Sequence, residues 1–280
     1  MKYDLIHVTP LNPVIGAEIH GVDLSKPLGE ATFKEIETAL HEHLVIFFRD
    51  QNLSPDAHMA FASQFGELEP PHPFFPKIDS HPQISVLEND EERPPETNYW
   101  HTDVTWRDKP PMGSVLYGAD VPSSGGDTLW ANMYAAYDQL PDDLKAKLEG
   151  MRAVYSIEVF DASQNYDNAK DKAALSEILK KYPPQSHPII RTHPVTGRKA
   201  LFVNSTFTQH IEGLDAAESE TLLQALYDVV KLPEVQVRFS WTKGAVAVWD
   251  NRATQHYAVA DYWPQYRRMH RITINGDKPV

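Results

Sequence analysis

Short strand candidates separated by turn residues run through the second half of the chain and limit its possible folds more than any other feature. From Gly113 onward, stretches rich in β-branched and aromatic residues alternate with turn signals. The candidates are Ser114–Gly118, Thr128–Trp130, Arg152–Ile157, Ile189–Thr192, Ala200–Val203, Val235–Phe239, Ala245–Trp249 and Met269–Asn275. So many short strands are typical of a β-sandwich or jelly roll. The 22 prolines and 13 glycines among 280 residues fit the turns that such a fold needs.

The first part of the chain indicates a mixed α/β segment. The elements expected from the spacing of apolar residues are the strands Ile15–Leu24 and Leu44–Phe48 and the helices Ala31–Glu42 and Ser54–Phe65. Ser54 suits the N-cap position of the second helix, and Pro55 suits its first turn, where no N–H is needed.

Helical insertions interrupt the later strands. We expect a helical hairpin around Asn132–Leu148 and a final helix over Asp215–Lys231. The polar stretch at about 158–185 has the composition of a mobile lid. No internal repeat and no linker rich in Pro, Ser or Gly divides the chain. The sequence therefore predicts one domain over residues 1–280, mainly β with α elaborations.

The composition excludes several classes of function. Lys and Arg number 26 and Asp and Glu 39, so the formal net charge is −13, which disfavours binding to nucleic acids and anionic membranes. The chain contains no cysteine, so any metal must be held by His, Asp or Glu. There is no apolar run long enough to span a bilayer and no signal-peptide pattern at the start, so we expect a cytoplasmic protein.

The sequence YWHTDVTW, residues 99–106, is the strongest candidate for a metal site. His101 and Asp103 would project to the same side of an extended backbone and could contact one ion. Two histidines and one carboxylate form the facial triad of non-haem Fe(II) oxygenases. His256, shortly after the apolar strand that ends at Trp249, is the candidate second histidine. A lone H-x-D pair is common by chance, so the prediction depends on the whole set.

Other histidines receive no role. His41 and His43 fit a solvated helix end, although an H-x-H pair can also bind a metal. The rest lie beside turns or on polar faces in the sequence pattern: His20, His58, His81, His187, His193 and His210.

Two arginines on the last predicted strand indicate anion binding. Arg267 and Arg271 point to one face if the strand is extended. Arginine suits the bidentate capture of a carboxylate or sulfonate, so two inward arginines imply two anions; the alternative is a solvated basic strand.

The turn before Thr128 resembles a phosphate-binding loop only superficially, because it lacks the lysine and glycine spacing of a Walker sequence. Its glycines would let the chain turn, leaving the Thr128 hydroxyl free to donate to a carboxylate. Packing alone would explain Thr128 equally well.

Taken together, these motifs resemble the taurine dioxygenase family of Fe(II)- and 2-oxoglutarate-dependent oxygenases, which includes alkylsulfatase and 2,4-dichlorophenoxyacetate dioxygenases. The resemblance covers nearly the whole chain, through TPLNPVIGAEIHGVDLSKPL, FFRDQNLSP, FGEL, WHTDVTW, PSSGGDTLWANMYAAYDQL, HPIIRTHPVTGRKALFVN, WDNRATQHYAVADY and RRMHRITINGDKP. It implies a double-stranded β-helix (jelly roll), Fe(II) as the metal, and 2-oxoglutarate and O2 as cosubstrates. It also implies a homodimer or homotetramer.

The resemblance also implies roles for individual residues. His101, Asp103 and His256 would be the iron ligands, and Thr128 and Arg267 would hold the distal carboxylate of 2-oxoglutarate. The remaining matches, in the substrate pocket, are Arg271 for a sulfonate, His72 for a second polar contact, and Val104 and Phe207 for apolar positions.

Three departures from the family pattern bear on the substrate. Phe75 stands where the taurine enzymes carry a tyrosine that binds the sulfonate, Thr97 replaces an asparagine, and Trp106 replaces a phenylalanine. Losing a hydroxyl donor to a charged group costs about 1–3 kcal/mol. Trp106 could favour an aromatic or longer alkyl body, or a cationic amine.

We therefore expect hydroxylation of a small anionic substrate, a taurine-like sulfonate, giving sulfite, an aldehyde, succinate and CO2. An alkyl sulfate ester or an aryloxyalkanoate is the alternative substrate. Alternatives of other classes are a jelly-roll zinc hydrolase or isomerase and a non-catalytic anion-binding protein.

Overall fold

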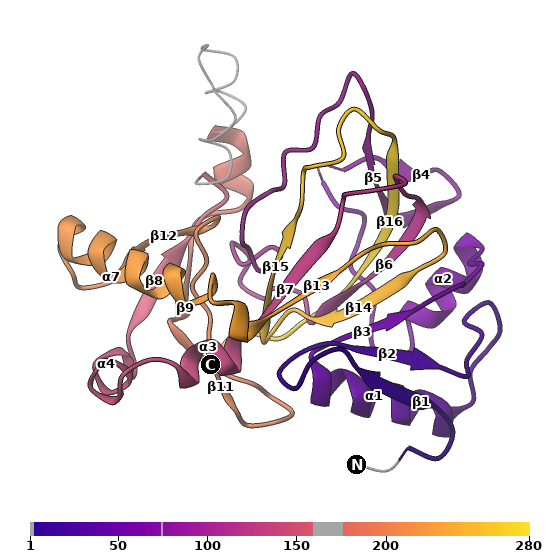
Figure 1. Cartoon of the computed structure of the whole chain (residues 1–280). Helices are drawn as coiled ribbons and strands as arrows, with labels where there is room; N and C mark the ends of the chain where they lie inside the picture. Colours follow the sequence, from indigo (N-terminus) through magenta and orange to yellow (C-terminus); the bar gives the residue numbers. More distant parts are fainter. Residues whose placement is uncertain (1–2, 74, 159–175) are drawn as a thin grey trace.

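The largest element of the fold is an eight-stranded, mostly antiparallel sheet. The computed structural model describes residues 3–73, 75–158 and 176–280 (Figure 1). The strand order is β1 (His7–Pro10), β2 (Ala17–His20), β3 (Val45–Phe48), β14 (Val246–Asp250), β6 (Gly113–Asp120), β16 (Arg267–Ile274), β5 (His81–Asn89) and β4 (Lys77–Ile78). The N-terminal strands and the C-terminal strand thus belong to one sheet, with β14 and β6 between them.

The central strands of this sheet are apolar on both faces. In β3, Val45 and Phe47 join one buried cluster, whereas Ile46 and Phe48 join another that also contains residues of α1 (Glu30–His43) and α2 (Pro55–Ala62). This alternation explains why β3 reads as a continuous apolar run rather than as alternating residues. Ser54 accepts a hydrogen bond from the Ala57 N–H and caps α2, as predicted.

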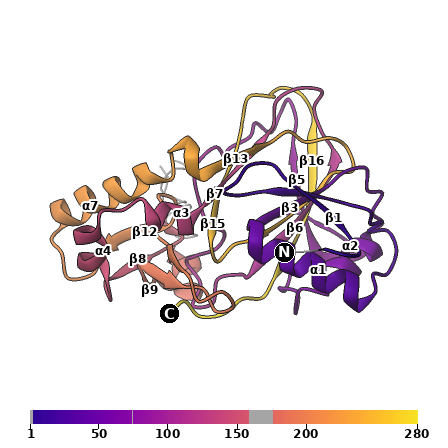
Figure 2. The ribbon, with the colours of Figure 1, turned by 60° about the horizontal axis from the view of Figure 1, so that its bottom comes forward.

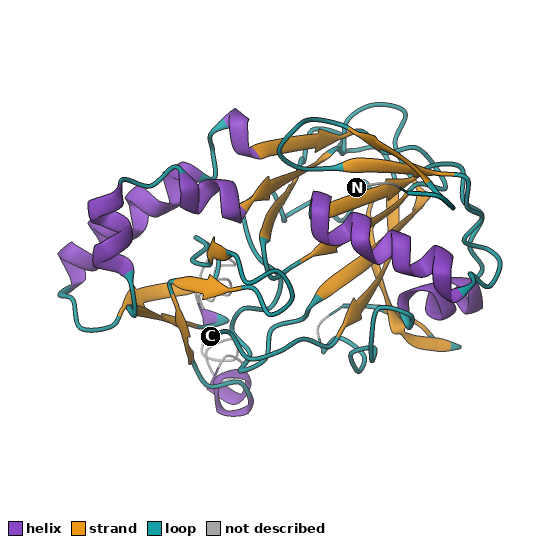
Figure 3. Cartoon of the chain, turned by 90° about the horizontal axis from the view of Figure 1, so that it is seen from below, coloured by secondary structure: helices purple, strands orange, loops and turns teal. Residues whose placement is uncertain are grey.

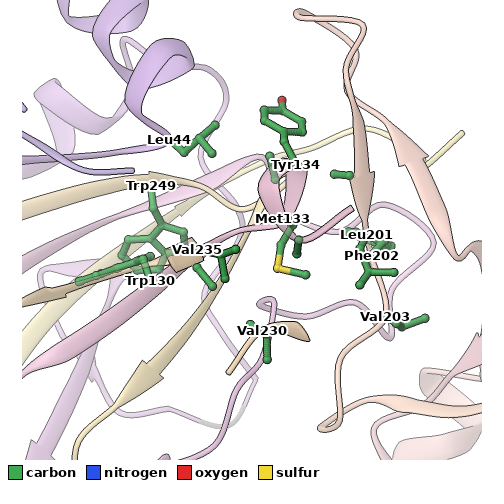
Figure 4. Packing of buried hydrophobic residues seen from close by; sticks show 14 of the residues in the cluster. Leu44, Trp130, Met133, Tyr134, Leu201, Phe202, Val203, Val230, Val235 and Trp249 are labelled. Carbon is green, nitrogen blue, oxygen red and sulfur yellow. The ribbon is translucent and has the colours of Figure 1, made fainter. Parts of the chain in front are cut away.

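A second, three-stranded sheet packs against the face of the eight-stranded sheet that carries Val45 and Phe47, called the inner face below. Its order is β13 (Gln236–Phe239), β7 (Thr128–Asn132) and β15 (Thr254–Ala258). Phe47 stacks on Phe239 with ring centroids 3.9 Å apart and meets Trp130 edge-on at 5.4 Å. Figure 4 shows Trp130 beside Trp249 in this core. The space between the two sheets holds the site described below.

A third group of elements lies on the opposite side of the molecule from α1 and α2 (Figures 2 and 3). It comprises the sheet β12 (Thr208–Ile211), β8 (Arg152–Tyr155) and β9 (Gln185–Pro188), the pair β10 (Ile190–Thr192) and β11 (Lys199–Leu201), the helices α3 (Met133–Asp138), α4 (Asp142–Leu148) and α7 (Ala216–Val229), and the short helix η1 (Pro233–Val235). A capping box formed by Asp215 and Glu218 starts α7 at the predicted place.

The structure confirms a mainly β fold with helical elaborations, and each strand predicted after Gly113 corresponds to an observed strand. The strand predicted at Ile15–Leu24 is shorter, because only Ala17–His20 pairs. Six strands were not predicted: β1, β4, β5, β9, β12 and β15. No helix in the described ranges has the length and apolarity needed to cross a membrane.

Much of the predicted lid at about 158–185 lies outside the described residues, which exclude 159–175. At the C-terminal end of the segment predicted as a lid, Gln185 belongs to β9 and pairs with Tyr155 of β8. Residues 176–181 are helical.

Candidate metal centre and active-site cavity

A cavity of about 450 Å³ lies between the two inner sheets. Strands β5, β6, β14 and β16 contribute to one wall and β7 and β15 to the other. Every residue given a role from the sequence borders this cavity: His72, Phe75, Thr97, His101, Asp103, Val104, Trp106, Thr128, Phe207, His256, Arg267 and Arg271.

His101, Asp103 and His256 converge at the inner end of the cavity. All three are buried, and one possible ligand atom from each lies within 4.8 Å of the other two. The backbones of His101 and His256 exchange two hydrogen bonds, N–H to O=C, at 3.1 and 2.8 Å. This isolated antiparallel bridge sets the two rings 4.1 Å apart, centroid to centroid.

The protonation of these three groups suits a metal ion. The Nδ1–H of His101 donates to the Tyr99 carbonyl at 3.0 Å, which leaves Nε2 free to bind a metal. Burial lowers the pKa of His101 and lowers that of His256 to about 3, so both imidazoles are neutral at pH 7.

Asp103 supplies the negative charge of the set. Burial would raise its pKa, but Arg271 and the nearby histidines outweigh this and hold it at about 2. Oδ2 of Asp103 is buried and has no hydrogen-bond partner in the described part of the chain. Two neutral imidazoles and a carboxylate with a free oxygen are a donor set that fits Fe(II).

The structure brings together the three residues named from the sequence, but their backbone differs from the one predicted. Asp103 lies in a turn, not in an extended strand, and Val104 adopts a left-handed φ of 56°. A β-branched residue in this conformation costs about 1–2 kcal/mol, so other contacts must hold the turn. One is the hydrogen bond from the Arg107 N–H to the Val104 carbonyl at 3.1 Å.

Arg271 links Asp103 to two aromatic rings on the cavity wall, those of Phe75 and His72. Its Nη1 donates to Oδ1 of Asp103 at 3.1 Å. The guanidinium also lies over the Phe75 ring, 5.1 Å from its centroid, and Phe75 in turn lies 4.4 Å from the His72 ring. Burial, with Arg271 and Arg107 nearby, lowers the pKa of His72 to about 3, so His72 is neutral.

Arg267 lies on the same face of β16, as the two-residue period predicts. It is buried, and no acidic side chain within the described ranges forms an ion pair with it. Its Nε has no hydrogen-bond partner there. The Tyr262 ring lies 5.6 Å from its guanidinium carbon, but no carboxylate among the described residues neutralises its charge, so Arg267 is suited to bind an anion.

Thr128 has a defined hydroxyl orientation. The indole Nε1–H of Trp241 donates to its Oγ1 at 2.9 Å, so the hydroxyl hydrogen is available for another acceptor. Gly126, with a φ of 70°, precedes it in the turn, and a Cβ there would lie 3.4 Å from Cδ of Arg267. The glycine therefore serves both the turn and the close approach of Arg267.

The rest of the lining is largely apolar. Val104, Trp106 and Phe207 are buried, and the Trp106 ring meets Tyr182 edge-on at 4.8 Å. Thr97 is exposed. A substrate body at this end would contact mainly hydrocarbon and aromatic surface.

Sequence reasoning missed several residues that support the site. Tyr99 orients His101, Trp241 orients Thr128, and Asn251 holds the backbone of Asp103. Trp241 and Asn251 act through hydrogen bonds between distant segments, whereas Tyr99 acts within the segment that carries His101. Tyr99 and Asn251 were visible only as neighbours of the predicted ligands.

The placement of three other histidines was wrong. His58, His187 and His193 are buried rather than on polar faces. Their Nε2 atoms form hydrogen bonds with the Val115 carbonyl, the Arg107 carbonyl and the Asp250 carboxylate. All three are core residues that do not border the cavity.

The buried triad and the two inward arginines together define the class of 2-oxoglutarate-dependent, non-haem iron oxygenases. Comparison with known proteins agrees. The family profile "Taurine catabolism dioxygenase TauD, TfdA family" matches residues 7–273, and the chain belongs to this family.

Individual relatives align over nearly the whole chain. An alpha-ketoglutarate-dependent sulfate ester dioxygenase from Pseudomonas putida is 40% identical, covering 98% of this chain and 91% of the relative. An alpha-ketoglutarate-dependent 2,4-dichlorophenoxyacetate dioxygenase from Cupriavidus pinatubonensis is 34% identical, covering 97% and 98%. The crystal structure of a taurine dioxygenase from Burkholderia xenovorans has a TM-score of 0.84 at 38% identity, covering 99% and 91%.

These matches confirm the resemblance and the enzyme class expected from the sequence. The protein is a dioxygenase that depends on Fe(II), 2-oxoglutarate and O2. The zinc hydrolase and the non-catalytic binding protein are thereby set aside.

Proposed function

We propose that this dioxygenase hydroxylates a small organic sulfonate or sulfate ester with an apolar body. His101, Asp103 and His256 would hold Fe(II), and Thr128 and Arg267 would hold the distal carboxylate of 2-oxoglutarate. The observation that carries the proposal is the buried Arg267, which has no carboxylate partner among the described residues, on the wall of the cavity that also contains the buried triad.

Arg271 and Phe75 support an oxoanion as the substrate head group. The arginine faces the cavity beside Asp103, where it could turn one or more N–H donors to a bound sulfonate or sulfate. Phe75 offers no hydroxyl, so the head group would depend on Arg271 and His72. The apolar side chains Val104, Trp106 and Phe207 would surround the carbon chain and exclude water from it.

When bound, iron with 2-oxoglutarate and O2 supplies the oxidant that hydroxylates a substrate carbon, while 2-oxoglutarate becomes succinate and CO2. The task of the protein is to place one C–H bond near the metal. Hydroxylation beside a sulfonate gives a product that breaks down to an aldehyde and sulfite. The same step beside a sulfate ester oxygen gives an aldehyde and sulfate.

An aryloxyalkanoate is a second candidate substrate. The Trp106 indole on the cavity wall could stack with an aromatic ring, and a relative that shares 34% identity is named for 2,4-dichlorophenoxyacetate. Its carboxylate would take the place of the sulfonate at Arg271.

The two inner sheets support a jelly-roll description of the core. We propose that the eight-stranded sheet and the sheet β13-β7-β15 are the two walls of the double-stranded β-helix. Both contribute side chains to one apolar cluster, including Phe47 and Trp249 from the first and Trp130 and Phe239 from the second.

A substrate panel tests the function. Sulfonates including taurine, alkyl sulfates of increasing length, and aryloxyacetates would be incubated with Fe(II), 2-oxoglutarate and O2. Succinate would be scored together with sulfite, sulfate or the released phenol. The Asp103→Ala variant is the control and should form no succinate while keeping its fold by circular dichroism. Wild-type turnover in that variant would refute the metal assignment.

A further inference from the structure

The side chain of Asn251 is fully engaged with the segment that carries Asp103. Asn251 is 2% exposed and lies in the turn between β14 and β15. Its Oδ1 accepts from the Asp103 N–H at 2.9 Å, and its Nδ2 donates to the carbonyls of Asp103 at 3.0 Å and Pro111 at 3.1 Å. Both amide hydrogens and the amide oxygen are therefore used.

These bonds replace a missing sheet partner. Asp103 sits in a turn, and its backbone N–H and C=O have no backbone partner in the described part of the chain. A buried peptide group left without a partner is strongly unfavourable. One side chain supplies both the acceptor and the donor, in the way that a neighbouring strand would.

The same interaction continues the pairing between the two segments that carry the triad. His101 pairs with His256 through two backbone hydrogen bonds. The Thr102 hydroxyl donates to the Thr254 carbonyl at 2.9 Å. The next residue, Asp103, is hydrogen-bonded to the side chain of Asn251. The side chains of Thr102 and Asn251 therefore continue the contact between the two segments beyond the His101–His256 bridge, where backbone pairing ends.

We propose that Asn251 is a positioning residue of the metal centre. By fixing the peptide groups on both sides of the Asp103 Cα, it sets the direction in which the carboxylate leaves the turn relative to His101 and His256. The turn also contains Val104, whose left-handed backbone conformation is unfavourable for a β-branched residue. Without the hydrogen bonds from Asn251, the segment would relax to a more favourable conformation. This inference rests on the proposed metal site.

The test is the affinity for Mn²⁺ alone, measured from the electron paramagnetic resonance signal of the free ion. Asn251→Ala removes all three side-chain hydrogen bonds. Asn251→Asp keeps the size and the acceptor but places an oxygen where two carbonyls need a donor. In both variants, loss of support for a ligand should weaken Mn²⁺ binding roughly 10- to 100-fold.

Asn132 offers a matched control. It is also buried, and its side chain forms three hydrogen bonds, to the Val14 carbonyl and from the N–H groups of Tyr134 and Ala135. None of these partners is a member of the triad. Asn132→Ala should lower the melting temperature but leave Mn²⁺ affinity within about 2-fold of wild type, which separates positioning from a general loss of stability.

The outcomes are distinguishable. If wild type does not bind Mn²⁺, or Asp103→Ala binds it equally well, the metal site itself is wrong. If wild type binds and both Asn251 variants bind as tightly, or if Asn132→Ala loses as much affinity, Asn251 is only structural. The visible spectrum of bound Co²⁺ gives a second readout, because it should change in Asn251→Asp and stay unchanged in Asn132→Ala.

Discussion

Arg271 donates a hydrogen bond to Oδ1 of Asp103 at 3.1 Å, so a cation facing the substrate end of the cavity directly contacts a member of the metal-binding triad. Both side chains are buried. A charge bound at Arg271 is therefore felt at Asp103 with little screening by solvent. Arg267, on the same strand face, lacks such a carboxylate among the described residues.

Replacing Arg271 with alanine should affect the substrate and spare 2-oxoglutarate. Because a buried, charge-assisted hydrogen bond to the head group is lost, we expect KM for the substrate to rise roughly 30-fold or more. The Kd for 2-oxoglutarate should stay within about 2-fold, since Arg267 is intact. Arg268→Ala, on the opposite face of β16, is the control and should change neither value. If the affinity for 2-oxoglutarate falls instead, the roles assigned to Arg267 and Arg271 are reversed.

Thr128→Val should weaken 2-oxoglutarate binding. The substitution keeps the shape but removes a hydroxyl that can donate to the distal carboxylate, so Kd should rise about 10-fold. Trp241→Phe leaves the hydroxyl but removes the indole N–H that orients it, so the loss should be smaller, about 2- to 5-fold. Anaerobic titration with Fe(II) present measures both. If Thr128→Val binds 2-oxoglutarate as tightly as wild type, Thr128 contributes only to packing.

Phe75→Tyr should improve the use of short sulfonates such as taurine. The ring already lies under the Arg271 guanidinium, so a hydroxyl at its edge would be close to the anion held there. A hydrogen bond to a charged group contributes about 1.5–3 kcal/mol, so KM should fall at least 10-fold.

Phe75→Leu provides the opposite change. It removes the aromatic face beneath Arg271 and should raise KM for every anionic substrate. An unchanged taurine KM in Phe75→Tyr would mean that the ring edge points away from the head group.

The sequence was most informative where side chains alternate strictly between the two faces of a strand. Arg267 and Arg271 could be assigned to one face because residues of a strand alternate, and β16 is regular enough for this rule to hold. The same rule applied to His101 and Asp103 predicted that their side chains converge, which they do, but for the wrong reason. Their convergence depends on a turn and on Asn251, a tertiary contact that no local pattern contains.

Two of the unpredicted strands, β15 and β9, were missed for a related reason. β15 has the sequence TQHYA, whose buried residues Thr254, Gln255 and His256 are polar, so it lacks the apolar alternation of an ordinary strand. β9, with the sequence QSHP, begins at the last residue of the segment predicted as a lid and has no apolar alternation, although pairing with β8 fixes it in a sheet. In both cases tertiary pairing overrides a weak local preference.

The pH dependence of stability should reflect His58, which is buried and donates from Nε2 to the Val115 carbonyl at 3.2 Å. Burial lowers its pKa to about 3, against about 6.5 in the unfolded chain. Below pH 6.5, His58 therefore binds a proton in the unfolded state but not in the native state. The free energy of unfolding should fall as the pH drops from about 6.5 towards 3, by up to about 1.4 kcal/mol per pH unit.

His58→Gln isolates this effect, because glutamine offers an N–H donor and does not titrate. Between pH 7 and pH 5, urea unfolding should show wild type losing up to about 2 kcal/mol more than the variant. From pH 7.5 to 9 the two should differ by a constant amount, because His58 is neutral in both states there. Parallel curves down to pH 5 would mean that His58 becomes protonated in the native protein and that its burial is not maintained in solution.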